Sequence, residues 1–340
     1  MGEPFTSGSQ PEELDPDHLR SFPFFPNQFY SELPLPRAME AASRLICVVL
    51  TRDGRLSRGQ KEMLLRGVGT VLRNSPCALC FKQAPPAQSP QDRQLLKFTM
   101  KLAQLASQIS EKDVESLRQI GCDDAAILEA IVTTATGRMF CTLADGLVPP
   151  PVQPAAQLEA LPDLHSAEST GPYLALSPIL PDDFAPYRFL REQFGRVPNI
   201  FSAQALRPDI LEAEVNVLSA ILFPADLLSR VQKENILLLI SARNLNSYFV
   251  AVHTEILTTL GVSREESKQM IANLKNSALS QADKSLLDFA CRLANPQKEK
   301  MPAQELSEHG FTNHQIVEAI AMTALTNFLN TVQFGLGTVV

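Results

Sequence analysis

An internal repeat is the feature that most constrains this chain of 340 residues. When the sequence is displaced by 172 positions, residues 26–77 align with residues 198–249 without a gap, and identities recur along the stretch. The correspondence resumes after a change in length, where Gly121 matches Gly310. An ordered series of matches indicates two copies of one structural unit. The sequence therefore predicts a tandem duplication whose two copies pack as an internal pseudo-dimer.

Both copies have the periodicity of helices. Apolar residues recur at intervals of three and four in twelve segments, and no segment alternates convincingly with the period of two that strands show. The predicted helices are residues 38–50, 59–72, 92–108, 111–120, 124–144, 209–222, 229–244, 248–260, 264–274, 282–294, 303–309 and 313–334. The chain is therefore predicted to be all-α, with two tandem helical domains.

Proline-rich segments set the predicted domain boundaries. Residues 1–25 form an N-terminal extension, and residues 148–186 are predicted to be an extended linker, because proline blocks helix interiors. The domains are then residues 26–147 and 187–340, and the first is the shorter. Fourteen residues follow Cys77 before the match resumes, against 33 at the same place in the second copy. Four apolar linker residues are expected to pack on the surface: Tyr173, Leu174, Leu176 and Ile179.

Composition excludes several classes of function. The net charge is −7, and an acidic chain without a basic cluster is poorly suited to nucleic acid or an anionic membrane surface. No apolar stretch approaches the roughly 18 residues of a membrane span. Six cysteines are too few for a disulfide scaffold, so a reduced, cytoplasmic location is expected. No phosphate-binding loop or metal-ligand spacing is present, so we expect neither cofactor nor metal.

Candidate chemistry in the first copy centres on two cysteines. Ser75 has the character of an N-cap and Pro76 suits the first helical position, which places Cys77 in the first helical turn and Cys80 one turn later. The positive end of a helix favours a thiolate. We therefore expect the pKa of Cys77 to fall below about 8.5 and its thiol to alkylate faster than core cysteines. The alternative is that both thiols are small buried hydrophobic groups.

The corresponding place in the second copy carries an imidazole instead. Tyr248 and Phe249 stand there, and His253 follows one turn after Phe249, while Glu234 lies on the preceding predicted helix. A carboxylate and an imidazole from adjacent helices can relay protons. At pairing distance we expect the carboxylate to favour the charged imidazole over the opposing effect of burial. The alternative is a partly exposed histidine beside a capping glutamate.

These motifs resemble the carboxymuconolactone decarboxylase and alkyl hydroperoxidase D family. The family pattern is Ser-Arg-x-x-Lys-Glu, then Cys-x-x-Cys twelve residues later, then His four residues after the second Cys. Residues 197–201 and 286–330 also look like its peroxidase-related members. The resemblance implies an all-helical fold that assembles into homo-oligomers. It also implies, for redox members, a Glu and a His that relay protons to a peroxidatic second Cys, which the first Cys resolves.

Neither copy retains the full motif. In order, the family's Glu, two Cys and His correspond to Glu62, Asn74, Cys77 and Phe81 in the first copy, and to Glu234, Asn246, Phe249 and His253 in the second. The second copy has therefore lost both sulfurs, so it cannot perform dithiol chemistry. The first copy keeps the attacking sulfur without its imidazole, and Cys80 adds a sulfur outside the family positions.

The resemblance leads first to a thiol-dependent, peroxidase-like oxidoreductase. A hydroperoxide would be the substrate, with Cys77 attacking, Glu62 relaying protons and Cys80 resolving the oxidised sulfur. This function requires an accessible Cys77 with a partner.

Two other functions stay open. One is a cofactor-free acid–base enzyme of the decarboxylase type, in which Glu234 and His253 act on a small carboxylate and Tyr248 assists. It requires a cavity that reaches His253. The other is a non-catalytic binding or scaffold protein, which requires neither site and leads if the Glu–His pair is intact but no cavity reaches it.

Overall fold

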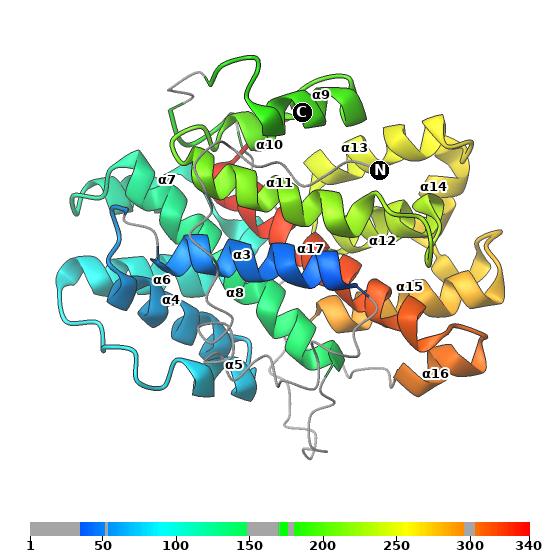
Figure 1. Ribbon diagram of the computed structural model, residues 1–340, viewed down its shortest axis with the longest axis horizontal. Coiled ribbons are helices and arrows are strands. Elements are labelled where there is room, and N and C mark those ends of the chain that lie inside the picture. The colour runs from blue at the N-terminus through cyan, green and yellow to red at the C-terminus, as the bar shows by residue number, and fades with distance from the viewer. Residues whose placement is uncertain (1–34, 52–53, 148–168, 170, 176–179, 296–302) are drawn as a thin grey trace.

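A computed structural model describes residues 35–51, 54–147, 169, 171–175, 180–295 and 303–340 (Figure 1). In these residues the chain is all-α, as predicted, with fifteen α-helices and no strand. The predicted N-terminal extension, residues 1–25, lies outside the described part, as does most of the predicted linker.

All twelve predicted helical segments are helices. The first half contains α3 (Pro36–Thr51), α4 (Arg58–Val71), α5 (Ser75–Cys80), α6 (Pro90–Gln104), α7 (Glu111–Arg118) and α8 (Asp124–Leu147). The second half contains α9 (Ala185–Phe194), α10 (Asn199–Ser202), α11 (Pro208–Leu222), α12 (Arg230–Arg243), α13 (Ser247–Thr259), α14 (Arg264–Ala272), α15 (Gln281–Ala294), α16 (Ala303–Glu308) and α17 (Asn313–Leu336). Short 3₁₀ turns, Ala106–Gln108 and Leu274–Asn276, follow α6 and α14. The sequence did not predict α9 and α10, and α9 begins inside the predicted linker.

Helices α4 and α12 begin with the same capping arrangement. The Ser57 hydroxyl accepts from the Gln60 backbone N–H, and the Gln60 side chain accepts from the Ser57 N–H. Ser229 and Gln232 repeat this capping box in the second half. Such a box satisfies two backbone donors that a helix start leaves unpaired. Ser57 and Ser229 are therefore the N-caps of α4 and α12.

In each half, a buried lysine–glutamate pair connects the start of one helix, α4 or α12, to a central helix, α8 or α17. Lys61 Nζ lies 3.5 Å from Glu129 of α8, whose carboxylate also accepts from the Leu56 N–H at 3.0 Å. Lys233 Nζ lies 2.7 Å from Glu318 of α17, which accepts from the Leu228 N–H at 2.6 Å. The four charged side chains are at most 2% exposed. Each glutamate thus holds both a buried cation and the loop before a helix.

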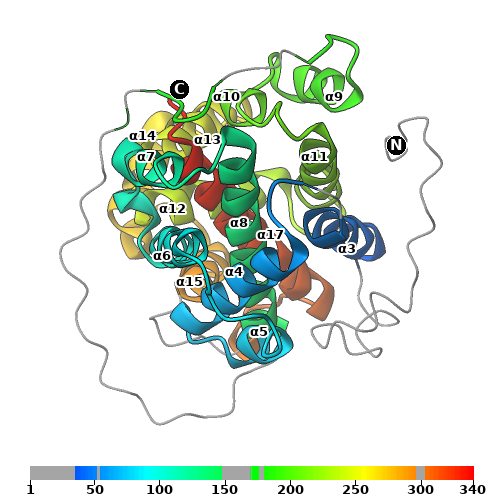
Figure 2. The same cartoon turned by 90° about the vertical axis from the view of Figure 1, so that its left-hand side faces the viewer.

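Helices α8 and α17 cross at the centre of the molecule, while α3 and α11 pack beside each other on one flank (Figure 2). A Cβ on Gly146 would lie 2.6 Å from a methyl group of Ile320, and one on Gly335 would lie 2.7 Å from a methyl group of Ile131. The contacts therefore run in opposite directions along the two helices, which are antiparallel. Each glycine lets an isoleucine of the other helix approach its backbone.

A buried cation lies between these two contact points. Arg138 of α8 places Nη2 3.5 Å from Oδ1 of Asn327 on α17. Asn327 also donates through Nδ2 to the Thr142 hydroxyl at 2.9 Å. Burial lowers the pKa of Arg138 to about 10, partly opposed by the neighbouring Cys141. The crossing is therefore polar at its middle and apolar toward its ends.

Helix α8 departs from one expectation. By length and composition it could cross a membrane, although no apolar stretch of that length is predicted from the sequence. Within the protein, however, 94% of its 18-residue apolar window is buried. Its apolar character therefore matches its place in the core, where helices are apolar on all sides.

Part of the predicted linker packs against both halves, since the Ala175 N–H donates to Asp124 Oδ2 of α8 at 2.8 Å. The Tyr173 N–H donates to the Leu336 carbonyl at 2.8 Å, and Tyr173 and Leu174 are both buried. This confirms the expected packing for these two residues. Leu176 and Ile179 lie outside the described residues.

Candidate functional site

The same turn precedes the candidate site in each half. Arg73 and Leu245 occupy corresponding positions with φ of 56° and 61°, a conformation that non-glycine residues rarely adopt. The next residue caps the following helix, because Asn74 Oδ1 accepts from the Cys77 N–H at 2.9 Å and Asn246 repeats this with Phe249 at 3.0 Å. The predicted cap Ser75 is therefore wrong, since Ser75 is already the first residue of α5.

In the second half the predicted glutamate and histidine meet. Glu234 Oε2 lies 2.7 Å from His253 Nδ1, and Arg230 lies 2.7 Å from Glu234 Oε1. Glu234 is fully buried and His253 is 4% exposed, so the alternative of a partly exposed histidine is wrong. An ionised carboxylate can only accept, so the pairing places a proton on Nδ1. Arg230 was not among the predicted site residues, although it stands four residues before Glu234, on the same helix face.

The other imidazole nitrogen is buried without a partner. Among the described residues, no hydrogen-bond partner reaches His253 Nε2. The Phe249 ring stacks on the imidazole with centroids 5.4 Å apart, and the Tyr248 ring meets Phe249 edge-on at 5.1 Å. Phe249 thus places an aromatic ring where the family pattern has sulfur. A buried nitrogen without a partner is uncommon and calls for a functional or structural explanation.

Tyr248 is directed toward α10 rather than toward the imidazole. Burial raises the pKa of its hydroxyl, although hydrogen bonds to the backbone of Ile200 and Asn199 and the charge of Arg196 oppose that effect. Tyr248 therefore has a structural partner of its own. Its predicted assistance to His253 stays a prediction.

In the first half the expectation for Cys77 is wrong. Cys77 does lie in the first turn of α5, but burial raises its pKa well above the usual value, and the neighbouring Cys141 thiol raises it further. The side chain is 3% exposed, and α5 has only six residues, so desolvation outweighs the helix end. Cys80 is half-buried, and burial raises its pKa to about 12.

The thiol that faces Cys77 is that of Cys141 on α8. A hydrogen bond joins the two thiols, and no disulfide joins them. Asn74 also binds this part of α8, donating to the Cys141 carbonyl at 3.0 Å. Nothing in local spacing could have indicated Cys141, since 64 residues separate it from Cys77.

The remaining predicted groups of the first half have other partners. Glu62 Oε1 lies 2.9 Å from Nε of Arg58, on a partly exposed face of α4. Phe81 fills the position of the family's histidine and is buried. No contact described in the structure joins Glu62 to Cys77 or Cys80. The first half therefore does not assemble the predicted relay.

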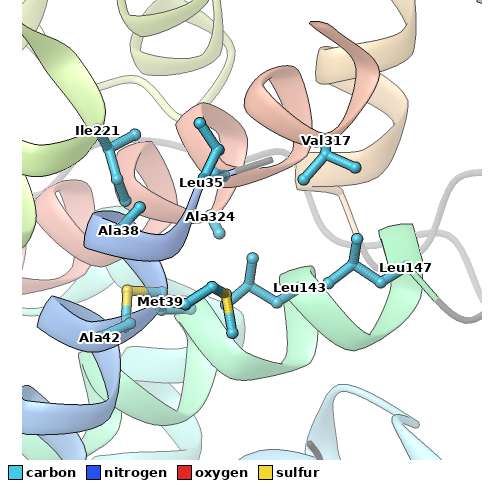
Figure 3. Close-up of a pocket in the computed structure, with 11 residues that line it drawn as sticks. Leu35, Ala38, Met39, Ala42, Leu143, Leu147, Ile221, Val317 and Ala324 are labelled. Atoms are coloured by element: carbon cyan, nitrogen blue, oxygen red, sulfur yellow. The ribbon is translucent and has the colours of Figure 1, made fainter. Parts of the chain in front are cut away.

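The cavities lined by described residues include three that bear on the candidate sites. A small one of about 20 Å³ lies between α3, α8, α11 and α17, and its lining of Leu, Ala, Met, Ile and Val offers no chemistry (Figure 3). A second, of about 10 Å³, lies against Cys77 and Phe81. The third is an open groove of about 760 Å³ bounded by α12, α14 and α15. Neither His253 nor Glu234 lines any of these three.

The described residues contain no cluster of three or more His, Cys, Asp or Glu side chains placed to hold a metal ion. The polar groups of the two candidate sites instead bind one another. Their chemistry is therefore that of a paired imidazole in one half and of buried thiols in the other.

Comparison with known proteins gives a structural resemblance. No family model matches the sequence, and no curated protein matches it. An uncharacterized peroxidase-related protein from Silicibacter sp. TM1040 aligns at 24% identity and a TM-score of 0.44, over 49% of this chain and 89% of that chain. A second protein, described as an alkylhydroperoxidase AhpD core and an uncharacterized peroxidase-related protein, comes from Ralstonia eutropha JMP134. It aligns at 27% identity and a TM-score of 0.45, over 51% of this chain and 93% of that chain. The chain resembles these AhpD-like proteins. Each one matches about half of it.

Proposed function

We propose that this chain is a non-catalytic binding or scaffold protein, because the Glu234–His253 pair is intact but no cavity described in the structure reaches it. The second candidate is a proton-transfer site in the second half, where His253 would act on a small carboxylate. One observation favours that candidate: Nδ1 of His253 is held by Glu234, while Nε2 is buried and lacks a partner among the described residues. A general base needs a fixed orientation and a free lone pair. Glu234 supplies the orientation, and Arg230 holds Glu234 in place.

The reaction can be written without a cofactor. Nε2 takes a proton from the carbon beside the substrate carbonyl, and the electron pair of the broken C–H bond moves to the carbonyl oxygen. The imidazolium that forms is stabilised by Glu234 across the 2.7 Å contact. The imidazolium then returns the proton to the enolate oxygen or to a different carbon of a conjugated enolate, which gives isomerisation.

A thiol-dependent peroxidase function in the first half has weaker support. The contact between Cys77 and Cys141 favours it, because two adjacent thiols can form a disulfide once a hydroperoxide has oxidised one of them. Burial and the raised pKa of Cys77 and Cys80 oppose it, because the thiolate is the nucleophile.

We also propose that the two halves arose by duplication. The paired capping boxes, the paired Lys–Glu contacts and the reciprocal glycine–isoleucine contacts of α8 and α17 support it. Reciprocal contacts of this kind are typical of a twofold relation between like units.

Solvent hydrogen exchange distinguishes the non-catalytic role from proton transfer. The protein is incubated in heavy water with a panel of small carboxylates, and deuterium incorporation beside the carbonyl is followed by NMR. If His253 transfers protons, His253→Gln should abolish exchange and Glu234→Gln should slow it by about 10² or more. His309→Gln, at an exposed histidine, is the matched control. Exchange that is lost in His253→Gln contradicts the non-catalytic role, and exchange that survives it contradicts proton transfer at His253. A folded protein that exchanges no member of the panel supports the non-catalytic role.

A further inference from the structure

The segment that distinguishes the second half from the first forms one wall of an open groove. Helix α14 and the turn Leu274–Asn276 lie in the longer stretch of the second half, and they face the end of α12 and the side of α15 (Figure 1). The volume of about 760 Å³ is that of a small-molecule site. The first half has a proline-containing turn, residues 83–87, in place of this segment. The groove therefore belongs to the second half alone.

The groove carries a positive charge that the described residues do not neutralise. Arg243, Lys275 and Lys284 line it from three different elements, and no carboxylate among the described residues forms an ion pair with any of them. The carboxylate in the lining is Asp288, and Arg292 already binds it at 2.8 Å. Three cations without an ion-pair partner in the described part of the chain are unusual around one concave surface when the net charge is −7. Such a surface concentrates anions.

The rest of the lining is partly apolar. Ile271 and Leu274 are half-buried and stand with Ala242 and Ala272 beside the cations. The amides of Asn273 and Gln281 and the Ser285 hydroxyl complete the lining. An inorganic ion would contact only the polar part, whereas a ligand with an anionic head and an apolar body would use both.

The groove is also separate from the Glu234–His253 pair. Arg243 stands nine residues after Glu234 on α12, which is about 13 Å along the helix axis at 1.5 Å per residue. The imidazole and its carboxylate do not line the groove. Binding in the groove can therefore be measured independently of proton transfer at His253.

We propose that this groove binds a small amphiphilic anion, with a phosphate or carboxylate head against Arg243, Lys275 and Lys284 and an apolar body against Ile271 and Leu274. The three cations come from α12, the turn after α14, and α15. A bound head group would therefore connect the segment peculiar to the second half with the two helices shared with the first. The proposal concerns binding alone and does not rest on the proposed proton transfer.

Three probes with the same eight-carbon chain test the proposal by isothermal titration calorimetry. Octyl phosphate and octanoate, each below its micellar concentration, distinguish a phosphate head from a carboxylate head, and octan-1-ol has the same tail without charge. We expect one of the anions to bind with 1:1 stoichiometry and at least tenfold more tightly than octan-1-ol. Affinity for that anion should fall as the salt concentration rises.

Charge-matched variants locate the site. We expect the double variant Lys275→Gln/Lys284→Gln to weaken anion binding at least tenfold. Arg243→Gln, which removes the cation contributed by α12, should also weaken anion binding on its own. Lys97→Gln/Lys268→Gln removes two exposed charges that do not line the groove, and its affinity should stay within twofold of the parent. Anions that bind no better than octan-1-ol, or control and groove variants that weaken binding equally, would overturn the proposal.

Discussion

The two halves place different side chains at equivalent points of the same backbone arrangement. In the first half the helix after the turn presents Cys77 to Cys141, and in the second it presents Phe249 beside His253. The turn with positive φ and the asparagine cap are present in both. The turn and the asparagine cap, which shape the backbone, are the same in both halves, whereas the side chains capable of chemistry differ. One turn thus supports a thiol pair in one half and an imidazole–carboxylate pair in the other.

The buried ion pairs of the two halves differ in a second way. Glu129 is bound by Lys61 and also by Arg207, which comes from the second half. Among the described residues, Glu318 has Lys233 as its ion-pair partner. The first pair is therefore doubly neutralised, and it joins the two halves.

Removing the lysine should expose this difference most strongly. Lys233→Met leaves Glu318 buried without its cation, and breaking a buried pair in this way costs about 3–5 kcal/mol of unfolding free energy. Lys61→Met should cost less, because Arg207 still neutralises Glu129. Urea-induced unfolding followed by circular dichroism measures both. Equal losses would show that Arg207 does not compensate.

Glu214 is a second asymmetry, since Ala42 stands at the corresponding place in the first half. Burial raises the pKa of Glu214 to about 8, although the Gln204 side chain opposes part of this effect. At pH values between the pKa of this carboxyl in the unfolded chain and about 8, the folded protein holds a proton that the unfolded chain has lost. The free energy of unfolding therefore falls as the pH rises through that window. Glu214→Gln removes the titration. Its stability relative to the parent should rise by roughly 3 kcal/mol between pH 5 and pH 8.

The Glu214 measurement needs a control that keeps the carboxylate. Glu212→Gln removes a partly buried glutamate two residues earlier on α11. Its stability difference from the parent should vary much less over the same pH range. A flat profile for Glu214→Gln would show that this carboxyl is ionised inside the folded protein.

The crossing of α8 and α17 tests whether equivalent substitutions in the two halves lower the free energy of unfolding equally. Gly146→Ala forces a methyl group toward Ile320, and Gly335→Ala does the same toward Ile131. Overpacking of this kind costs about 1–3 kcal/mol. We expect the two losses, measured by urea unfolding, to agree within about 0.5 kcal/mol. A large loss for one variant alone would break the proposed twofold relation.

The smallest expected effect concerns thiol labelling in the first half. With Cys77 buried and its pKa raised, iodoacetamide at neutral pH should modify Cys80 before Cys77, and both more slowly than a free thiol. The labelling rate of Cys80 should keep rising toward pH 12, provided that the fold persists. Mass spectrometry of the tryptic peptides identifies the modified residue. Rapid labelling of Cys77 would restore the thiol-based interpretation.

Much of the fold could be predicted from sequence because helical periodicity and capping are local. The apolar periodicity of residues 229–244 and 248–260 placed Glu234 and His253 on adjacent helices. The predicted pairing of Glu234 with His253 is confirmed because it depended only on helix order and one-turn spacing.

The parts that could not be predicted depend on tertiary contacts. Asn74 caps α5 instead of Ser75, since its side chain also reaches α8. The pKa of Cys77 depends on burial and on Cys141, which comes from the same distant helix. Sequence spacing indicates where a helix begins, but it does not indicate how deeply the first turn of that helix is buried from solvent.

The contact between Arg138 and Asn327 has a consequence for how such a molecule can change. These residues stand at corresponding positions of α8 and α17. In an assembly of two identical chains, the residue at such a crossing would face its own copy, and two buried guanidinium groups would repel each other. A single chain carrying both copies is free of that restriction. The residue on α8 and the residue on α17 can each change alone, so a guanidinium group on one helix can pair with an amide on the other.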